Sequence, residues 1–268
     1  PRNLSAKIKI PKFYLEKLNN KKISLIYNKF QKSLNLKKNF VVAVSGGPDS
    51  LALAFLAKIY SIKNNLKSKF FIVDHKLRKE STIEAKIVKN LLRKYSINLE
   101  ILTWKGKKPK KNIQSLARKM RYKLLTNKCY QLKVKDLLIA HHQDDLFENF
   151  FIRISRGSGL KGLISFDEKT EYKDINFLRP LLSQKKEDLS FISKYVFNFF
   201  IEDPSNKDEK FQRIKIRKSM KELQKFGLDK NKFLITIKNL KHSNNVVNFY
   251  VNQNLKNNAF FLSKEKKL

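Results

Sequence analysis

The residues of this chain best suited to chemistry lie in the segment Ser-Gly-Gly-Pro-Asp-Ser at positions 45–50. An apolar β-type run precedes it and an apolar stretch of helix formers follows, which predicts a strand, a tight turn and a helix start. Glycine lets backbone N–H groups approach an anion, and a helix N-terminus adds positive dipole and unpaired donors. The segment lacks the Gly-Lys-Ser/Thr ending of a Walker loop. It therefore predicts another kind of phosphate site, with an ordinary strand-to-helix turn as the alternative.

A second group of reactive side chains lies at 141–148, which reads His-His-Gln-Asp-Asp-Leu-Phe-Glu. Asp145 and Glu148 are three residues apart and therefore share one face of a predicted helix. No arginine is evident on that face, and adjacent carboxylates are costly unless they meet a metal ion or ammonium groups. A metal site that includes histidine is one explanation. Capping of the helix by Asp144 is another, and the two are compatible.

A third group lies on the helical segment 112–131. Gln114, Arg118 and Arg121 follow one another at i, i+4 and i+7, beside an apolar stripe that predicts a core-facing side. Arginines in that arrangement could clamp phosphate with paired hydrogen bonds. A solvated helix face is the alternative.

Alternating strands and helices must position these groups. The predicted strands are 40–45, 69–74, 98–103 and 135–140, and the predicted helices lie near 49–63, 80–95 and 112–131. Strands separated by helices of this length predict an α/β fold with a doubly wound parallel sheet. Ligands of such sheets bind beyond the carboxyl ends of the strands, where 45–50, 74–75 and 141–145 all fall. The sequence therefore predicts one shared site.

The overall charge favours a polyanionic partner. The chain of 268 residues holds 59 Lys and Arg against 23 Asp and Glu, a net charge of +36, and cations that meet phosphates release condensed counterions. A lysine-rich composition without function and an anionic membrane surface are the alternatives. No apolar run approaches the ~18 residues that span a bilayer. The single cysteine, Cys129, excludes an intrachain disulfide and a Cys-x-x-Cys centre, and we expect a cytoplasmic protein without a membrane partner.

The chain divides into three predicted regions. Residues 1–24 form a basic N-terminal arm, of which 1–20 could instead be a first helix, and 25–207 form the α/β domain. Residues 208–268 form a small, basic helical unit with helices near 208–226 and 231–255. The loop 105–111 is rich in lysine and carries Gly and Pro. It is either a contact for RNA phosphates or a solvated loop.

Several segments, in this order along the chain, resemble the tRNA(Ile)-lysidine synthetases, which belong to the N-type ATP pyrophosphatases of the PP-loop superfamily. They read Ser-Gly-Gly-Pro-Asp-Ser (45–50), Val-Asp-His-Lys-Leu-Arg (73–78), Asn-x-Gln-x-x-Ala-Arg-x-x-Arg-Tyr (112–122), Ala-His-His-Gln-Asp-Asp-x-x-Glu (140–148), Arg-Gly-Ser-Gly-Leu-Lys-Gly-Leu (156–163), Arg-Pro-Leu-Leu (179–182) and Glu-Asp-Pro-Ser-Asn (202–206). The resemblance covers about residues 25–220. It implies a sheet like that of the adenine nucleotide alpha hydrolases.

The resemblance also implies a reaction. Such enzymes use ATP and Mg²⁺ to adenylate the C2 oxygen of the wobble cytidine in the CAU-anticodon tRNA(Ile), and the ε-amine of L-lysine then displaces AMP. It assigns ATP binding to Ser45, Gly46, Gly47, Pro48, Asp49, Ser50, Asp74, His75 and Arg118; catalysis to Asp49, Arg121, Asp145 and Glu148; lysine binding to Asp145 and Glu148; and a metal ion to Asp49.

The partner implied by the resemblance is tRNA. We expect Lys107, Lys108, Lys110, Lys111, Arg213 and Arg217 to contact it, and a homodimer is compatible with the sequence. A tRNA thiolase of the same superfamily would need catalytic or cluster-binding cysteines, and the chain has one. A small-molecule amidating synthetase does not explain the charge of +36. A non-catalytic RNA-binding protein is a further alternative.

Overall fold

The structure is a computed structural model that describes residues 10–78, 80–106, 113–202 and 212–258. The chain forms two compact units, one of Pro1–Leu146 with Asp167–Asn206 and one of Phe147–Phe166 with Lys207–Leu268. These units differ from the predicted regions in two places. Residues 147–166 belong with the C-terminal helices, and the predicted arm contributes to the core of the first unit. No helix within the described residues combines the length and apolar character that a membrane span requires.

The first unit is built on a six-stranded sheet with the order β3-β2-β1-β4-β6-β5. The strands are β1 (Phe40–Val44), β2 (Ser68–Asp74), β3 (Leu99–Thr103), β4 (Asp136–Leu138), β5 (Lys169–Tyr172) and β6 (Ile175–Leu178). All neighbours pair in parallel except β5 and β6, which form an antiparallel hairpin. The predicted parallel sheet is confirmed for β1 to β4. The hairpin was not predicted, because β5 reads Lys-Thr-Glu-Tyr and has no apolar run.

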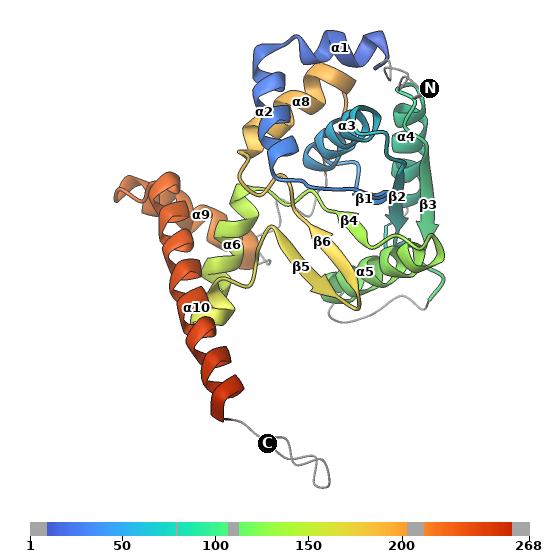
Figure 1. Ribbon diagram of the computed structural model, residues 1–268. Coiled ribbons are helices and arrows are strands. Elements are labelled where there is room, and N and C mark those ends of the chain that lie inside the picture. The colour runs from blue at the N-terminus through green and yellow to red at the C-terminus, as the bar shows by residue number, and fades with distance from the viewer. Residues whose placement is uncertain (1–9, 79, 107–112, 203–211, 259–268) are drawn as a thin grey trace, which may run out of the picture. The chain divides into compact units, whose positions relative to one another are not determined.

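Helices cover one face of this sheet (Figure 1). They are α1 (Lys12–Leu18), α2 (Lys21–Lys32), α3 (Pro48–Lys63), α4 (Ser81–Arg93) and α8 (Lys186–Phe197). Helix α3 is apolar on all sides and buried through residues 50–57, as expected of a helix in the centre of a core. Tyr14 of α1 and Ile23 of α2 are also buried in this core, and α1 agrees with the predicted alternative of a first helix.

Helix α5 (Ile113–Gln131) covers the opposite face. Leu125 and Cys129 of α5 pack with Val41 and Leu137, whereas the neighbouring strand residues, such as Val42, pack on the other side. Alternate strand residues point to opposite faces of a sheet, so both faces are covered. The predicted doubly wound architecture is confirmed.

The second unit is helical. It contains the later turns of α6 (Gln143–Ile154), together with α7 (Leu160–Leu163), α9 (Gln212–Lys225) and α10 (Lys230–Asn258). Its core centres on Phe233, whose ring centroid lies 4.4 Å from that of Phe147 and 4.8 Å from that of Phe150. Met220 and Ile237 complete the buried cluster. A cluster of aromatic and aliphatic side chains therefore holds α6, α9 and α10 together within this unit.

Candidate active site

The predicted glycine turn lies between β1 and α3, and Ser50 holds it closed from within. Its Oγ accepts hydrogen bonds from the N–H groups of Ser45 (3.0 Å) and Gly46 (3.1 Å) and donates to the carbonyl of Gly47 (3.0 Å). Ser50 is 4% exposed. This side chain therefore organises the turn, and the N–H groups of Ser45 and Gly46 are occupied by it.

The turn is also held from outside. Gly46 has a φ of +87°, and its carbonyl accepts a hydrogen bond from the N–H of Ile201 (2.9 Å). A Cβ on Gly46 would lie 2.8 Å from Val88 Cγ2 and 2.9 Å from Ile201 Cδ1. Ser193 of α8 donates to the carbonyl of Pro48 (2.5 Å). Position 46 therefore favours glycine for two reasons. Its backbone is left-handed, and the neighbouring side chains leave no room for a Cβ.

The site lies where the order of the strands reverses. From β1 the chain continues through α3 to β2 on one side, and it returns through α5 to β4 on the other side of β1. Such a switch point leaves a crevice beyond the carboxyl ends of the strands, where α/β sheets bind their ligands. The turn at 45–50 follows β1 and the histidines at 141–142 follow β4. The structure therefore brings these two predicted groups together.

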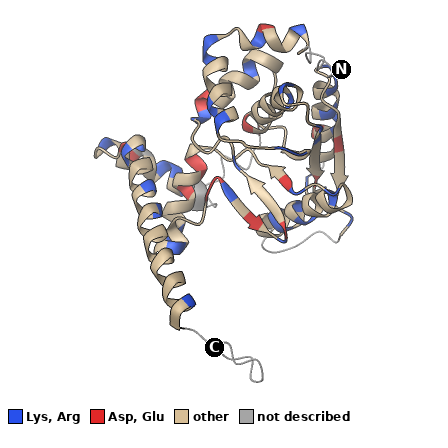
Figure 2. Cartoon of the chain, viewed as in Figure 1, with Lys and Arg blue, Asp and Glu red and all other residues tan. Residues whose placement is uncertain are grey.

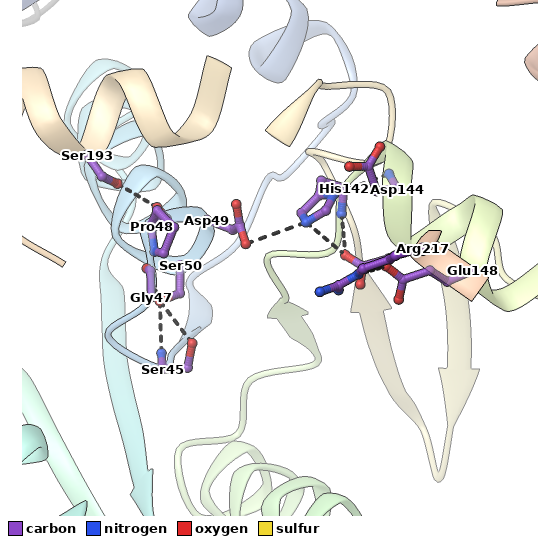
Figure 3. A network of polar contacts seen from close by, with 11 residues as sticks. Ser45, Gly47, Pro48, Asp49, Ser50, His142, Asp144, Glu148, Ser193 and Arg217 are labelled. Atoms are coloured by element: carbon purple, nitrogen blue, oxygen red, sulfur yellow. Dashed lines mark hydrogen bonds and ion pairs between the residues drawn. The ribbon is translucent and has the colours of Figure 1, made fainter. Parts of the chain in front are cut away.

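His142 connects the two sides of the switch point (Figure 3). Its Nε2 lies 3.5 Å from Asp49 Oδ2 and 3.5 Å from Asp145 Oδ2. Its Nδ1 accepts a hydrogen bond from the N–H of Asp144 (3.2 Å), and Asp145 Oδ2 accepts one from the N–H of His142 (2.9 Å). His142 and Asp145 thus form the reciprocal cap of α6. The predicted cap by Asp144 is wrong, because α6 begins at Gln143.

The environment of His142 favours its charged form. Burial by itself would lower the pKa of the ring, but the hydrogen bond to Asp49 and the negative charges of Asp145, Asp49 and Asp144 outweigh burial and raise that pKa. The Nδ1 contact with Asp144 requires an unprotonated Nδ1. Full protonation would therefore strengthen the contacts at Nε2 and remove one bond of the helix cap.

Asp145 and Glu148, two of the three carboxylates of α6, have different partners. Asp145 belongs to the cap and to the His142 contact in the first unit, whereas Glu148, 2% exposed, pairs within the second unit with Arg217 of α9. The prediction that no arginine neutralises this face is therefore wrong. Arg217 follows Glu148 by 69 residues in the sequence, so helix periodicity alone could not reveal the pair. The predicted tRNA contact of Arg217 stays a prediction, since the pair with Glu148 does not test it.

At the end of β2, the carboxylate of Asp74 forms hydrogen bonds with the residues that follow it in the chain. It accepts hydrogen bonds from Lys76 N–H (2.9 Å), Ser81 Oγ (2.8 Å) and Thr82 Oγ1 (2.6 Å). Burial acts to raise the pKa of Asp74, but these hydrogen bonds outweigh it and lower the pKa. Asp74 therefore anchors the start of α4, an arrangement that leaves it a positioning role beside any nucleotide.

His75 and Arg121 meet at the same end of β2. Arg121 Nε lies 3.4 Å from His75 Nε2. Burial, and next the charge of Arg121, lower the pKa of His75 to about 4, so the ring is neutral at neutral pH. Arg118 lies one helical turn away with its guanidinium 5.0 Å from the ring of Tyr122. Helix α5 thus delivers Arg121 to the strand ends, as the predicted stripe requires.

The remaining predicted residues are not tested by the structure. Lys107, Lys108, Lys110 and Lys111 lie outside the described residues, and so does the side chain of Arg213. Sequence reasoning also missed contributors to the site. Arg179 donates from Nε to His141 Nδ1 (3.2 Å), and its only signal was its place in the Arg-Pro-Leu-Leu segment.

The residues at the turn fit a magnesium ion that is bound together with a nucleotide. Asp49 Oδ1 is buried without a hydrogen-bond partner, while Oδ2 faces His142. In the described part of the chain, no cluster of three or more His, Cys, Asp or Glu side chains could hold a metal ion. Mg²⁺ usually takes only one or two carboxylates and completes its shell with water and phosphate oxygens. One carboxylate oxygen at a phosphate site satisfies that requirement.

Comparisons with known proteins agree with this geometry. A family model described as a PP-loop domain matches residues 16–223. A curated relative from Orientia tsutsugamushi, named tRNA(Ile)-lysidine synthase, is 40% identical over 182 residues, which cover 68% of this chain and 41% of the relative. A relative of the same name from Rickettsia conorii is 37% identical over 203 residues, covering 73% and 42%. The chain therefore spans less than half the length of these relatives.

A solved structure shows the same fold. The U34-tRNA thiolase NcsA from Methanococcus maripaludis superposes with a TM-score of 0.70 at 19% sequence identity, covering 82% of this chain and 79% of that one. At this identity the likeness concerns the fold alone.

Proposed function

Because this chain belongs to the PP-loop domain family, we propose that it uses ATP to modify a tRNA, as a tRNA(Ile)-lysidine synthetase. One observation carries the proposal most directly. The Asp49–His142 contact joins the glycine turn after β1 to the acidic start of α6 after β4, at the switch point of the sheet. This contact supports the proposal, because it joins the turn to Asp145 through His142.

In the first step, the C2 oxygen of the wobble cytidine attacks the α-phosphorus of ATP. The bond from that phosphorus to the bridging oxygen breaks, and pyrophosphate leaves with the electron pair. The first N–H groups of α3, at Asp49 and Ser50, have no carbonyl partner inside the helix and suit the departing phosphates. Arg121, with neutral His75 beside it, supplies positive charge without a competing histidine cation. Mg²⁺ held by Asp49 would spread the phosphate charge.

In the second step, the lysine ε-amine attacks C2, the C2–O bond breaks, and AMP leaves. The amine must first lose a proton, since an ammonium group is no nucleophile. Asp145 or Glu148 accepts it in this proposal. Lysine carries two amino groups, and Asp145 and Glu148 offer one negative charge for each. Arg217, which pairs with Glu148, remains a predicted tRNA contact.

The C-terminal helices suit the tRNA. Helix α10 carries four lysines in its first twelve residues and a fifth at Lys256, and it has no Asp or Glu between Lys230 and Asn258 (Figure 2). Helix α9 has a single acidic residue, Glu222. Lys107, Lys108, Lys110, Lys111 and Arg213 remain predicted contacts for the tRNA backbone. Binding through phosphates should weaken steeply as salt rises.

The experiment that tests this function is incorporation of labelled lysine into CAU-anticodon tRNA(Ile), with pyrophosphate release measured in parallel. We expect multiple-turnover pyrophosphate release only when ATP, the tRNA and lysine are all present. Without lysine, one turnover should leave an adenylated tRNA. Pyrophosphate release that ignores the tRNA would contradict the proposal and indicate a small-molecule enzyme. Incorporation of sulfur in place of lysine would indicate a thiolase.

A further inference from the structure

Arg179 is a buried arginine directly after β6, and the proposed reaction gives it no role. The residue is 8% exposed. Its Nη1 donates to the carbonyl of Asp167 (2.7 Å) and to Thr170 Oγ1 (3.0 Å), and its backbone N–H donates to the carbonyl of Glu168 (2.7 Å). These bonds fasten the guanidinium to the β5–β6 hairpin. The orientation of Arg179 is therefore set by this hairpin.

Held in this way, Arg179 directs its Nε–H at a histidine. Arg179 Nε donates to His141 Nδ1 over 3.2 Å. A guanidinium has only donors and keeps its charge in proteins, so Nδ1 must act as the acceptor. The ring proton of neutral His141 must then reside on Nε2, because the partner of one ring nitrogen determines which nitrogen carries the proton. The contact makes His141 a hydrogen-bond donor through Nε2.

His141 lies close in sequence to the proposed nucleotide site. It follows β4, which pairs in parallel with β1, the strand that leads into the glycine turn. The next residue, His142, contacts Asp49 of that turn. A donor at these strand ends suits phosphate oxygens, and a neutral donor does not disturb the charge balance between Asp49 and a magnesium ion.

We propose that Arg179 is a positioning residue, which fixes His141 as an Nε2–H donor to the phosphate oxygens of ATP. This inference rests on the proposed function for its ligand. Its structural half, the tautomer of His141, is independent of any substrate. The two halves are therefore tested separately.

The first test is the tautomer of His141 in the unliganded chain. Two-bond ¹H–¹⁵N spectra of the histidines at about pH 8 distinguish the two neutral forms, and loss of one signal set in His141→Gln assigns it. We expect the Nε2–H form. An Nδ1–H form would overturn the proposal. This measurement stands even if the chain shows no activity with the tRNA.

The second test compares two amides at position 141. Gln places its amide near the position of Nε2, whereas Asn places its amide near that of Nδ1. If the outer N–H meets phosphate, His141→Asn should release pyrophosphate about tenfold or more slowly than His141→Gln, as for one lost hydrogen bond to a charged group. Equal rates, or a faster rate for His141→Asn, would show that His141 only accepts the hydrogen bond from Arg179 and does not contact phosphate. Either result would overturn the proposal.

The third test asks whether Arg179 acts through His141. Arg179→Lys keeps the charge but cannot make all the bonds of a planar guanidinium. We expect it to slow pyrophosphate release in the native background and to change it little in His141→Gln, because coupled residues do not add. The same loss in both backgrounds would mean that Arg179 only supports the hairpin. Melting curves of each variant show whether the fold survives.

Discussion

The first turn of α6 and the turn that follows it place similar carboxylates in opposite surroundings. Asp145 lies beside His142, whose pKa is raised by several nearby carboxylates. Glu148 is buried and paired with the guanidinium of Arg217. Asp145 thus shares a histidine with Asp49, whereas Glu148 is paired with a permanent cation.

The difference indicates that a ligand would meet different neighbouring groups at the two carboxylates. An incoming ammonium group would meet Asp145 beside His142, whereas it would meet Glu148 beside Arg217. The comparison therefore predicts that neutralising Glu148 also removes the ion pair with Arg217. It also predicts that the turn at 45–50, which supplies Asp49 to the first region, has the greatest influence on the reaction.

The largest effect is expected for Asp49→Asn, since it removes charge from both the His142 contact and the proposed metal ligand. Pyrophosphate release should fall by about a hundredfold to a thousandfold, as when a transition-state contact is lost. Ser45→Ala should act in the same direction. Asp174→Asn is the matched control, because its φ of +54° suits Asn and it lies in the β5–β6 turn. Unchanged turnover in folded Asp49→Asn would remove the turn from the mechanism.

The next effect comes from neutralising either of these two carboxylates. Asp145→Asn and Glu148→Gln should each raise the KM for lysine about tenfold to a hundredfold, the value of one charge-assisted bond. Adenylation should survive better, because it precedes attack by the amine. Loss of adenylation with an unchanged lysine KM would instead assign these carboxylates to a metal ion.

The pairing of Glu148 with Arg217 allows a sharper version of that comparison. Arg217→Met leaves a buried carboxylate without its cation and should destabilise the second unit by about 3 kcal/mol. Combining it with Glu148→Gln should restore much of this loss. Thermal unfolding of the three variants measures the coupling, and simple additivity would show that the pair does not stabilise the unit.

A smaller effect on stability is expected for Gly46→Ala. The left-handed backbone and the contacts of a new Cβ with Val88 and Ile201 should together lower the free energy of unfolding by about 1–3 kcal/mol. Gly157→Ala isolates the backbone contribution, because Gly157 has a φ of +67° and nothing within 4 Å of the added atom. Denaturant titrations compare the two. Equal losses would show that space around Gly46 is not limiting.

The last prediction concerns the pH dependence of stability contributed by His75. Its folded pKa of about 4 lies below the ordinary histidine value, so the unfolded chain binds the proton more readily. The stability from neutral His75 is therefore present above about pH 6.5 and is lost as the pH falls towards 4. His75→Gln should flatten the stability curve in that interval. An unchanged curve would show that the ring is not held neutral in the fold.

The sequence predicted the parts of the fold that depend on local periodicity. The apolar run of β1, the glycine turn and α3 follow one another without interruption, and the structure confirms them. The polar strand β5 and the packing of α1 lack such a signal. The Glu148–Arg217 pair joins residues 69 positions apart, and the Arg179–His141 contact joins residues 38 positions apart. Contacts of this kind arise from tertiary packing, which no periodicity encodes.

The hydrogen bond from Ile201 to Gly46 has a consequence for sequence variation. Because it joins two main chains, every residue except proline at position 201 preserves the N–H that makes it. The Ile201 side chain, however, is one of the two that limit space above Gly46. Position 201 is therefore under two independent constraints. Substitutions by smaller residues should be tolerated, and proline should be excluded.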